Sequence, residues 1–140
     1  MNNRMELRFD ARAENEAFAR MVISAFLVQA NPMMSVVSEV RTAVSEAVTN
    51  AIVHGYAGTE GTVVLRAALE DMQAVIEVED YGLGIPDVKQ AMQPFYTSKP
   101  EQERTGIGFS LMQSFMDGVD VVSSPGSGTL VRMTKRLEEA

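Results

Sequence analysis

The feature of this sequence that most constrains its fold is a change in the spacing of its apolar residues around Gly55. Before that glycine, apolar residues recur at helical intervals in two segments, residues 13–30 and 34–54. After it, apolar and polar residues alternate with a period of two, over residues 63–70 and 74–79. Two long helices followed by a pair of strands are therefore expected, and Gly55 is the expected stop of the second helix.

The rest of the chain carries the same two signals over shorter segments. In the first helix, the apolar residues at helical spacing are expected to face the core: Phe18, Met21, Val22, Ala25 and Phe26. Further elements are expected as a strand at 4–10, a hairpin turn at Asp71-Met72, a short helix near 87–92, a helix at 107–117, and strands near 119–124 and 128–136. This order favours an α+β fold, a two-layer α/β sandwich in which helices cover one face of a mainly antiparallel, mixed sheet.

Length and charge limit the class of protein. With 140 residues, of which 46% are hydrophobic and 22% charged, the chain is expected to form a single globular domain over residues 1–140. Its net charge of −7 argues against general binding to nucleic acid or to anionic membranes. The lack of cysteine excludes disulfides and thiolate metal sites. The opening "MNNRMELRFD" does not resemble a signal peptide and no apolar run is long enough to span a bilayer, so a cytoplasmic location is expected.

Polar residues lie beside the apolar side of the second helix. That side is expected to consist of Val40, Ala43, Val44, Ala47, Val48, Ala51 and Ile52. Glu46 and Asn50 fall together just outside it, and His54 continues their row. A carboxylate can take a proton and a neighbouring carboxamide can offer a neutral oxygen to Mg²⁺. A solvated polar face is the alternative for this helix alone.

A second motif, Asp80-x-Gly82-x-Gly84, follows an apolar strand. The carboxylate can accept a hydrogen bond from an exocyclic amine such as that of adenine, and glycines let the backbone approach a ligand closely. The same spacing is common in ordinary turns, so the motif is weak by itself.

Two further motifs lie in the last third of the chain. Gly106-Ile107-Gly108 opens a helix whose free N–H groups suit phosphate, and Arg104 precedes it. Leu111 occupies the place of a third glycine, so this is no dinucleotide-binding fingerprint, and no GxxxxGK[ST] loop is present. Gly128-Thr129 begins the last strand and can bring a hydroxyl to the same pocket.

Together and in this order, these motifs resemble the N, G1, G2 and G3 boxes of the GHKL (Bergerat-fold) ATP-binding superfamily. The segments "MELRFDARAENEAFAR", "VSEAVTNAIVHGY" and "PFYTSKPEQERTGIGFSLM" resemble the compact anti-sigma-factor serine kinases. The resemblance is greatest to the sporulation type, which acts on sigma-F, and next to the stress-response type, which acts on sigma-B. Ser127 departs from the pattern, because many relatives carry lysine there.

The resemblance implies a role for each motif. Asn50 would ligate the Mg²⁺ that bridges the ATP phosphates, and Glu46 would be the catalytic base or orienting group for a serine hydroxyl. Asp80 would read adenine beside Gly82 and Gly84, Thr129 would support that end of the site, and His54 would be structural. Residues 93–108 would form a lid, with contacts to ATP or ADP from Thr97, Lys99, Arg104, Thr105, Gly106, Ile107, Gly108 and Phe109.

The resemblance also implies a function. The protein would be a homodimeric protein-serine/threonine kinase that inhibits a sigma factor of the sigma-F type and phosphorylates an anti-anti-sigma protein. Glu16 and Arg20 are candidates for the partner surface. Two alternatives stay open: a nucleotide-gated sigma-binding module without catalysis, and an ATP hydrolase or detached histidine-kinase catalytic domain. No direct contact with nucleic acid or membrane is expected.

Overall fold

The structure, a computed structural model, describes residues 1–92 and 108–138. The strands are β1 (Asn3–Asp10), β2 (Thr62–Glu70), β3 (Gln73–Asp80), β4 (Gly118–Ser123) and β5 (Thr129–Arg136). The helices are α1 (Glu14–Leu27), α2 (Met34–Asn50), α3 (Val88–Ala91) and α4 (Gly108–Phe115), with a 3₁₀ turn at Val28–Ala30 and a π-helical turn at Ala51–Gly55. Every strand and helix expected from the periodicity is present, and the described part of the fold is of the α+β class.

The sheet has the strand order β1-β2-β3-β5-β4, and each of its described pairings is antiparallel. The expected antiparallel character is thus confirmed, whereas the expectation of a mixed sheet was wrong. The connection that contains α4 carries the chain past β5 to the sheet edge, and β4 then returns through a tight turn into β5. Since β5 takes the place beside β3, no parallel pair forms within the described residues.

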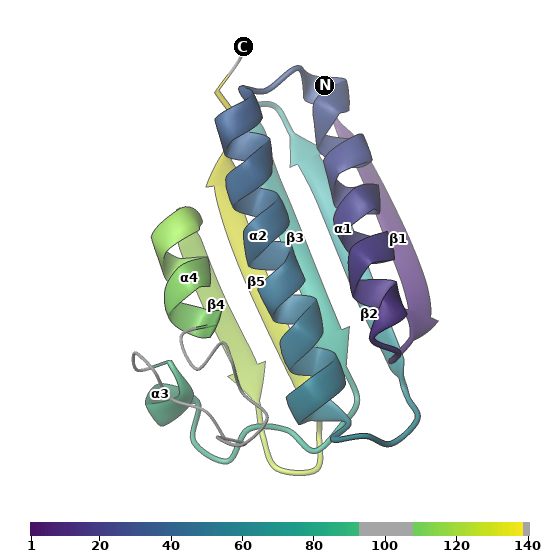
Figure 1. Ribbon diagram of the computed structural model, residues 1–140. Coiled ribbons are helices and arrows are strands. Elements are labelled where there is room, and N and C mark those ends of the chain that lie inside the picture. The colour runs from purple at the N-terminus through teal and green to yellow at the C-terminus, as the bar shows by residue number, and fades with distance from the viewer. Residues whose placement is uncertain (93–107, 139–140) are drawn as a thin grey trace.

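Helices α1, α2 and α4 cover one face of the sheet (Figure 1). The core lies between the two layers, and α2 contributes the most to it. The buried residues of α2 are Val36, Val37, Val40, Ala43, Val44, Ala47 and Val48. The residues of α2 that the spacing predicts to be on the apolar side are all in this set. Glu46 and Asn50 are half-buried at the border of this buried side.

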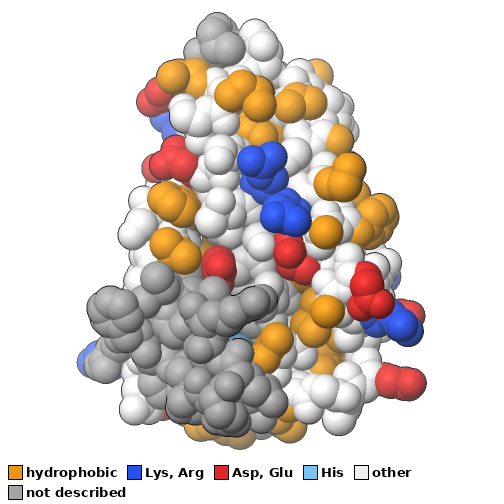
Figure 2. All heavy atoms as spheres, viewed as in Figure 1, with side chains coloured by type: hydrophobic (Ala, Val, Ile, Leu, Met, Phe, Trp, Pro, Cys, Tyr) orange, Lys and Arg blue, Asp and Glu red, His pale blue; other side chains and the backbone are white. Residues whose placement is uncertain are grey.

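The side of α1 that faces the core differs in part from the expected one: Phe26 is buried as expected, but Ala25 is exposed. Ala19, Ile23, Phe26 and Leu27 are buried, whereas Phe18 is 48% exposed and Met21 is 71% exposed. Helix α1 has apolar residues on two sides, so helical spacing alone fits either. In the view of Figure 2, hydrophobic side chains lie on the surface over α1 and near the start of α2, where Val28, Met33 and Met34 are exposed.

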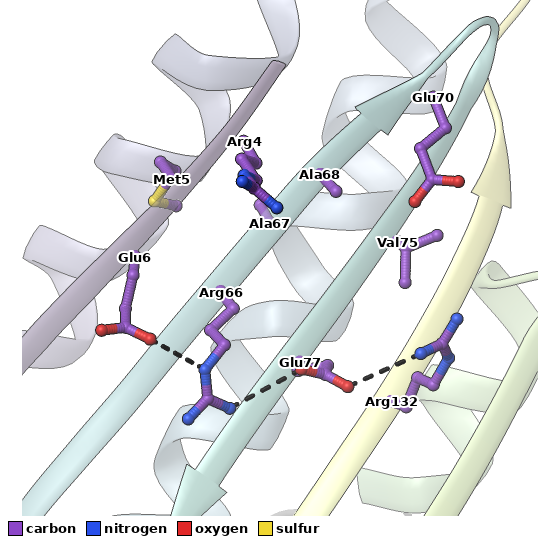
Figure 3. A pocket seen from close by; sticks show the side chains of 10 residues that line it. All are labelled: Arg4, Met5, Glu6, Arg66, Ala67, Ala68, Glu70, Val75, Glu77 and Arg132. Carbon is purple, nitrogen blue, oxygen red and sulfur yellow. Dashed lines mark hydrogen bonds and ion pairs between the residues drawn. The ribbon is translucent and has the colours of Figure 1, made fainter. Parts of the chain in front are cut away.

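The opposite face of the sheet carries a row of alternating charges. Glu6, Arg66, Glu77 and Arg132 are register partners on β1, β2, β3 and β5. Their ion pairs measure 2.9 Å for Arg66–Glu6 and 3.6 Å for both Arg66–Glu77 and Arg132–Glu77 (Figure 3). Glu79 adds a 2.8 Å contact to Arg66, and this hydrogen bond is the main reason why the pKa of Arg66 is raised. The four register partners, together with Arg4 and Glu70, line a cavity of about 570 Å³ on this face.

No helix in the described part of the chain is long and apolar enough to cross a membrane.

Candidate functional site

The residues of the first, second and fourth motifs gather at one end of the molecule. The end of α2, the end of β3 and the start of β5 all lie there (Figure 1). Asp80 is the last residue of β3 and Thr129 the first of β5, and the two are register partners. Both are buried, with exposures of 4% and 9%. Glu46 and Asn50 lie one helical turn apart on α2, a rise of about 6 Å.

The carboxylate of Asp80 is held in a fixed position. Its Oδ1 accepts a 2.9 Å hydrogen bond from the Gly82 N–H. Burial raises the pKa of Asp80, and backbone hydrogen bonds from Gly82 and Thr129 act against that rise. A buried carboxylate at the rim of a sheet, already supported by main-chain donors, is suited to accept a further hydrogen bond from a ligand amine.

The burial of Asp80 makes the stability of the ligand-free protein depend on pH. Its pKa is raised above the ordinary 3.8. The contribution of the protonated carboxyl group to the free energy of unfolding is therefore fully present below pH 3.8, and it is lost as pH rises through the raised pKa. We therefore expect Asp80→Asn to gain free energy of unfolding relative to the wild type as pH increases above 3.8. Urea denaturation of both proteins between acid and neutral pH measures this. A constant difference between them would contradict it.

Gly82 and Gly84 are required by the packing of the chain on itself. A Cβ on Gly82 would lie 1.9 Å from the Gly55 carbonyl oxygen. One on Gly84, whose φ is +78°, would lie 2.0 Å from the Ser124 carbonyl oxygen. From the sequence, these glycines are expected to make room for a ligand. The structure adds a second reason for glycine at both positions: the π-helical turn and the β4–β5 turn approach the loop after β3 closely.

Ser123 connects that loop to the turn between β4 and β5. Its Oγ accepts from the Ile85 N–H at 2.7 Å and donates to the Gly128 carbonyl at 2.7 Å. It also lies 2.8 Å from the Thr129 Oγ1. One hydroxyl therefore joins the motifs that contain Asp80 and Thr129. Ser123 was not among the site residues expected from the sequence. A serine at the end of a strand is ordinary, and its spacing from the other motifs does not mark it as part of a site.

Replacing Ser123 by alanine is expected to lower the free energy of unfolding by about 1–3 kcal/mol, because the part-buried Ile85 N–H loses its acceptor. Chemical denaturation checks the value. Ser124→Ala is the matched control, since Ser124 is exposed and follows directly in the chain. Equal stability of the two variants would show that the hydroxyl of Ser123 does not hold the loop.

Glu16 and Arg20, the candidates for a partner surface, lie on α1, and Glu16 contacts α2. Glu16 Oε2 accepts a 2.9 Å hydrogen bond from Ser45 Oγ and lies 3.4 Å from Arg20 Nε. Arg20 is the more exposed of the two, with 43% side-chain exposure against 23%. Glu16 thus joins the two helices, and Arg20 is the one of the pair that a partner could reach.

Most of the third motif lies outside the described residues. Thr97, Lys99, Arg104, Thr105, Gly106 and Ile107 belong to that segment. Gly108 is the first residue of α4, and Phe109 packs against the core. Within the described ranges, no group of three or more His, Asp or Glu residues is placed to hold a metal ion. His54 is half-buried in the π-helical turn, and Ser127 is exposed in the β4–β5 turn.

The chain is similar to known proteins over almost its whole length. Residues 9–135 match the model of the histidine kinase-like ATPase domain. The anti-sigma F factor of Caldanaerobacter subterraneus subsp. tengcongensis is 52% identical over 136 residues, which is 97% of this chain and 95% of that protein. The anti-sigma F factor of Bacillus subtilis (strain 168) is 48% identical over 141 residues, covering 100% of this chain and 97% of that protein.

A solved structure has a similar fold. The crystal structure of the RsbU and RsbW domains of Rv1364c from Mycobacterium tuberculosis superposes with a TM-score of 0.69 at 22% sequence identity. The match covers 96% of this chain and 32% of that longer one.

Proposed function

Since the chain belongs to the histidine kinase-like ATPase domain family and, within it, to the anti-sigma F factors, we propose that it is an ATP-dependent anti-sigma factor and protein-serine kinase. It would bind a sigma factor of the sigma-F type, hold it inactive, and phosphorylate a serine of the anti-anti-sigma protein that antagonises it. The observation that carries this proposal is the 52% identity to an anti-sigma F factor over 97% of the chain. All 140 residues would act as one domain.

In this proposal, the nucleotide lies at the end of the sheet where Asp80 and Thr129 meet. Asp80 would accept a hydrogen bond from the adenine amine, and Thr129 would support it from β5. The lid residues named from the sequence, from Thr97 to Phe109, would contact the phosphates. The support for adenine recognition is the burial of Asp80 together with its fixed orientation.

Asn50 would hold Mg²⁺ together with the phosphate oxygens of the nucleotide. The residues present fit such an ion, because Mg²⁺ in nucleotide sites takes few protein ligands and relies on phosphate and water. The carboxamide of Asn50 at the end of α2 can offer one neutral oxygen, which leaves the other positions around the ion to phosphate and water. When bound, the ion offsets the negative charge of the phosphates.

Glu46 would act on the serine hydroxyl of the protein substrate. As the serine oxygen forms a bond to the γ-phosphorus, the bond from that phosphorus to the β–γ bridging oxygen breaks and ADP leaves. The hydroxyl proton passes to the Glu46 carboxylate, which later returns it to water. Half-burial at the border of the core limits the directions that the Glu46 side chain can take, which is what a group that orients a nucleophile needs.

The proposal includes partners as well as chemistry. The protein would act as a homodimer, with Glu16 and Arg20 near the surface that meets the sigma factor. A net charge of −7 suits a partner with basic segments, such as a sigma factor. It would act in the cytoplasm, where its partners work, and without contacting DNA.

The test is a phosphotransfer assay with the purified protein, Mg-ATP and the anti-anti-sigma protein of the same organism. Phosphoserine on that protein, found by mass spectrometry, together with capture of the sigma factor in the presence of nucleotide, is the expected result. Sigma capture with no phosphoserine would favour a nucleotide-gated binding module. Capture of a stress-response sigma factor instead of a sporulation one would place the protein with the sigma-B type.

A further inference from the structure

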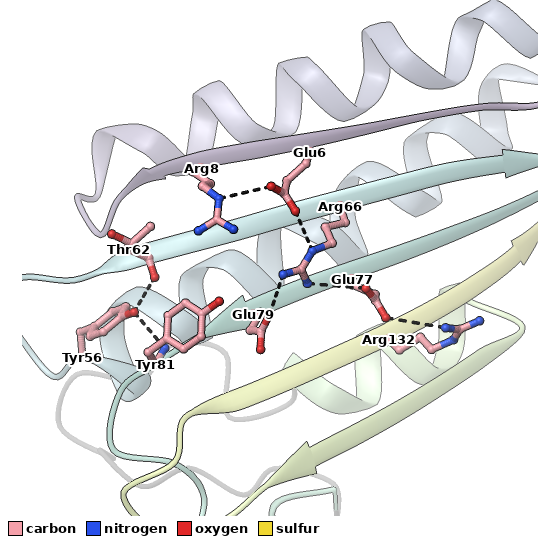
Figure 4. Close-up of polar contacts among 9 residues, drawn as sticks. All are labelled: Glu6, Arg8, Tyr56, Thr62, Arg66, Glu77, Glu79, Tyr81 and Arg132. Atoms are coloured by element: carbon pink, nitrogen blue, oxygen red, sulfur yellow. Dashed lines mark hydrogen bonds and ion pairs between the residues drawn. The ribbon is translucent and has the colours of Figure 1, made fainter.

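Tyr56 comes directly after the π-helical turn and reaches the segment that carries Asp80. Its side chain is buried, with 6% exposure. The hydroxyl accepts a 2.9 Å hydrogen bond from the Tyr81 N–H and donates to the Thr62 carbonyl (Figure 4). The phenol therefore links the first residue after Asp80 to the beginning of β2.

Gly55 makes a second connection to the same segment. Its carbonyl accepts a 2.7 Å hydrogen bond from the Leu83 N–H. A Cβ on Gly55 would lie 2.8 Å from the Asp80 carboxylate atoms, so the backbone of Gly55 lies directly against that carboxylate. Together, Gly55 and Tyr56 hold the chain at Tyr81 and at Leu83, on the C-terminal side of Asp80.

The π-helical turn is the reason that both residues point this way. The Tyr56 N–H bonds to the Ala51 carbonyl at 3.1 Å, a bond five residues back rather than four. Such a turn contains one residue more than an α-helical turn, and so rotates the residues after it by about 100°. Without this turn, the chain after α2 would place Gly55 and Tyr56 on a side of the helix that does not face Asp80. Turns of this kind are frequent at functional sites.

We infer that Tyr56 is a positioning residue for nucleotide-base recognition: its hydroxyl fixes the backbone after Asp80, and so fixes the carboxylate toward a 6-aminopurine. The inference rests on the proposed function, because it requires that Asp80 reads the base. It goes beyond that function by assigning base selectivity to a residue that acts through the backbone next to Asp80.

The structure offers a way to separate this role from simple packing. Tyr56→Phe keeps the buried ring and removes only the oxygen that accepts from Tyr81. Tyr81→Phe is the matched control, because it removes the same atom from a ring that is 54% exposed and leaves the Tyr81 N–H in place. ATP and ITP share sugar and phosphates and differ at position 6 of the base, where ATP has an amine and ITP a carbonyl.

The experiment measures the affinities of the wild type, Tyr56→Phe and Tyr81→Phe for ATP and for ITP by calorimetry. We expect Tyr56→Phe to weaken ATP binding about 10-fold and ITP binding much less, so that the preference for ATP falls. Tyr81→Phe is expected to keep the wild-type ratio. An unchanged ratio in Tyr56→Phe, even if both affinities fall together, would overturn the inference and reduce Tyr56 to packing.

Failure of the proposed function has a different signature. A wild-type protein that binds neither nucleotide, or both equally, would contradict base reading by Asp80 itself and the inference with it. If Tyr56→Phe does not fold, amide hydrogen exchange on the wild type answers the same question. ATP is expected to slow exchange of the Tyr81 N–H more than ITP does, and equal protection by the two nucleotides would overturn the role of Tyr56.

Discussion

Replacing Glu46 with glutamine is expected to reduce phosphotransfer to the anti-anti-sigma protein by about 100- to 10,000-fold, the range that a positioned general base contributes. Glutamine keeps the size of the side chain and its place at the border of the α2 core, but it cannot take the proton of a serine hydroxyl. ATP affinity is expected to stay close to that of the wild type, because other residues bind the adenine ring and the phosphates. Single-turnover phosphotransfer and equilibrium nucleotide binding measure the two effects separately.

Glu39→Gln is the matched control for this variant. Glu39 lies two turns earlier on the same side of α2, about 10 Å from Glu46 along the helix, and pairs with Lys135 at 3.6 Å. Its loss is expected to change stability slightly and phosphotransfer little. Normal phosphotransfer by Glu46→Gln would remove the base assignment, and equal loss of ATP binding would show that Glu46 acts on the nucleotide site instead.

Asp80→Asn is expected to weaken ATP binding on the order of 100-fold, although it leaves the fold intact. The carboxylate accepts backbone hydrogen bonds from Gly82 and Thr129, and adenine would bring a third donor. Asparagine has one acceptor oxygen, and its NH₂ group would face one of these donors. The variant is therefore expected to lose affinity for the ligand, while its stability relative to the wild type rises from acid to neutral pH because it carries no buried carboxylate.

Equilibrium binding of ATP to the wild type and to Asp80→Asn measures this loss. Asp120→Asn, on the exposed side of β4, makes the same chemical change away from the site and is expected to bind ATP normally. A variant that binds ATP as well as the wild type would show that Asp80 does not read the base. A variant that is both unstable and unable to bind would mean that Asp80 supports the fold.

The periodicity of the sequence predicted the helices and strands, because each helix shows apolar residues at helical spacing and each strand shows apolar residues that alternate with polar ones. It predicted the buried side of α2 because that helix has one continuous apolar side. It failed for α1, where Phe18 and Met21 compete with Ile23 and Leu27, and only packing against the sheet decides between them. The pairing of β3 with β5 was also beyond it, since strand order depends on where a crossover ends.

The candidate site was predictable where a residue carries its chemistry in its type. Asp80, Asn50 and Glu46 stand out by charge or amide beside apolar patterns. Tyr56 and Ser123 do not, because they act through hydrogen bonds to main-chain groups 25 and 38 residues away in sequence. Such contacts leave no spacing to detect, and a buried tyrosine or a strand-end serine is ordinary in any small domain.

The position of β1 at the sheet edge has a consequence for how the chain folds. Asn3 pairs with Leu69 and Asp10 with Thr62, so this strand closes loops that contain both long helices. The β2–β3 and β4–β5 hairpins, by contrast, need only their own turns. Loop closure over many residues slows folding, so β1 is expected to dock after the hairpins have formed. During synthesis β1 would leave the ribosome before the other strands of the sheet, and its neighbour β2 would follow only after both long helices.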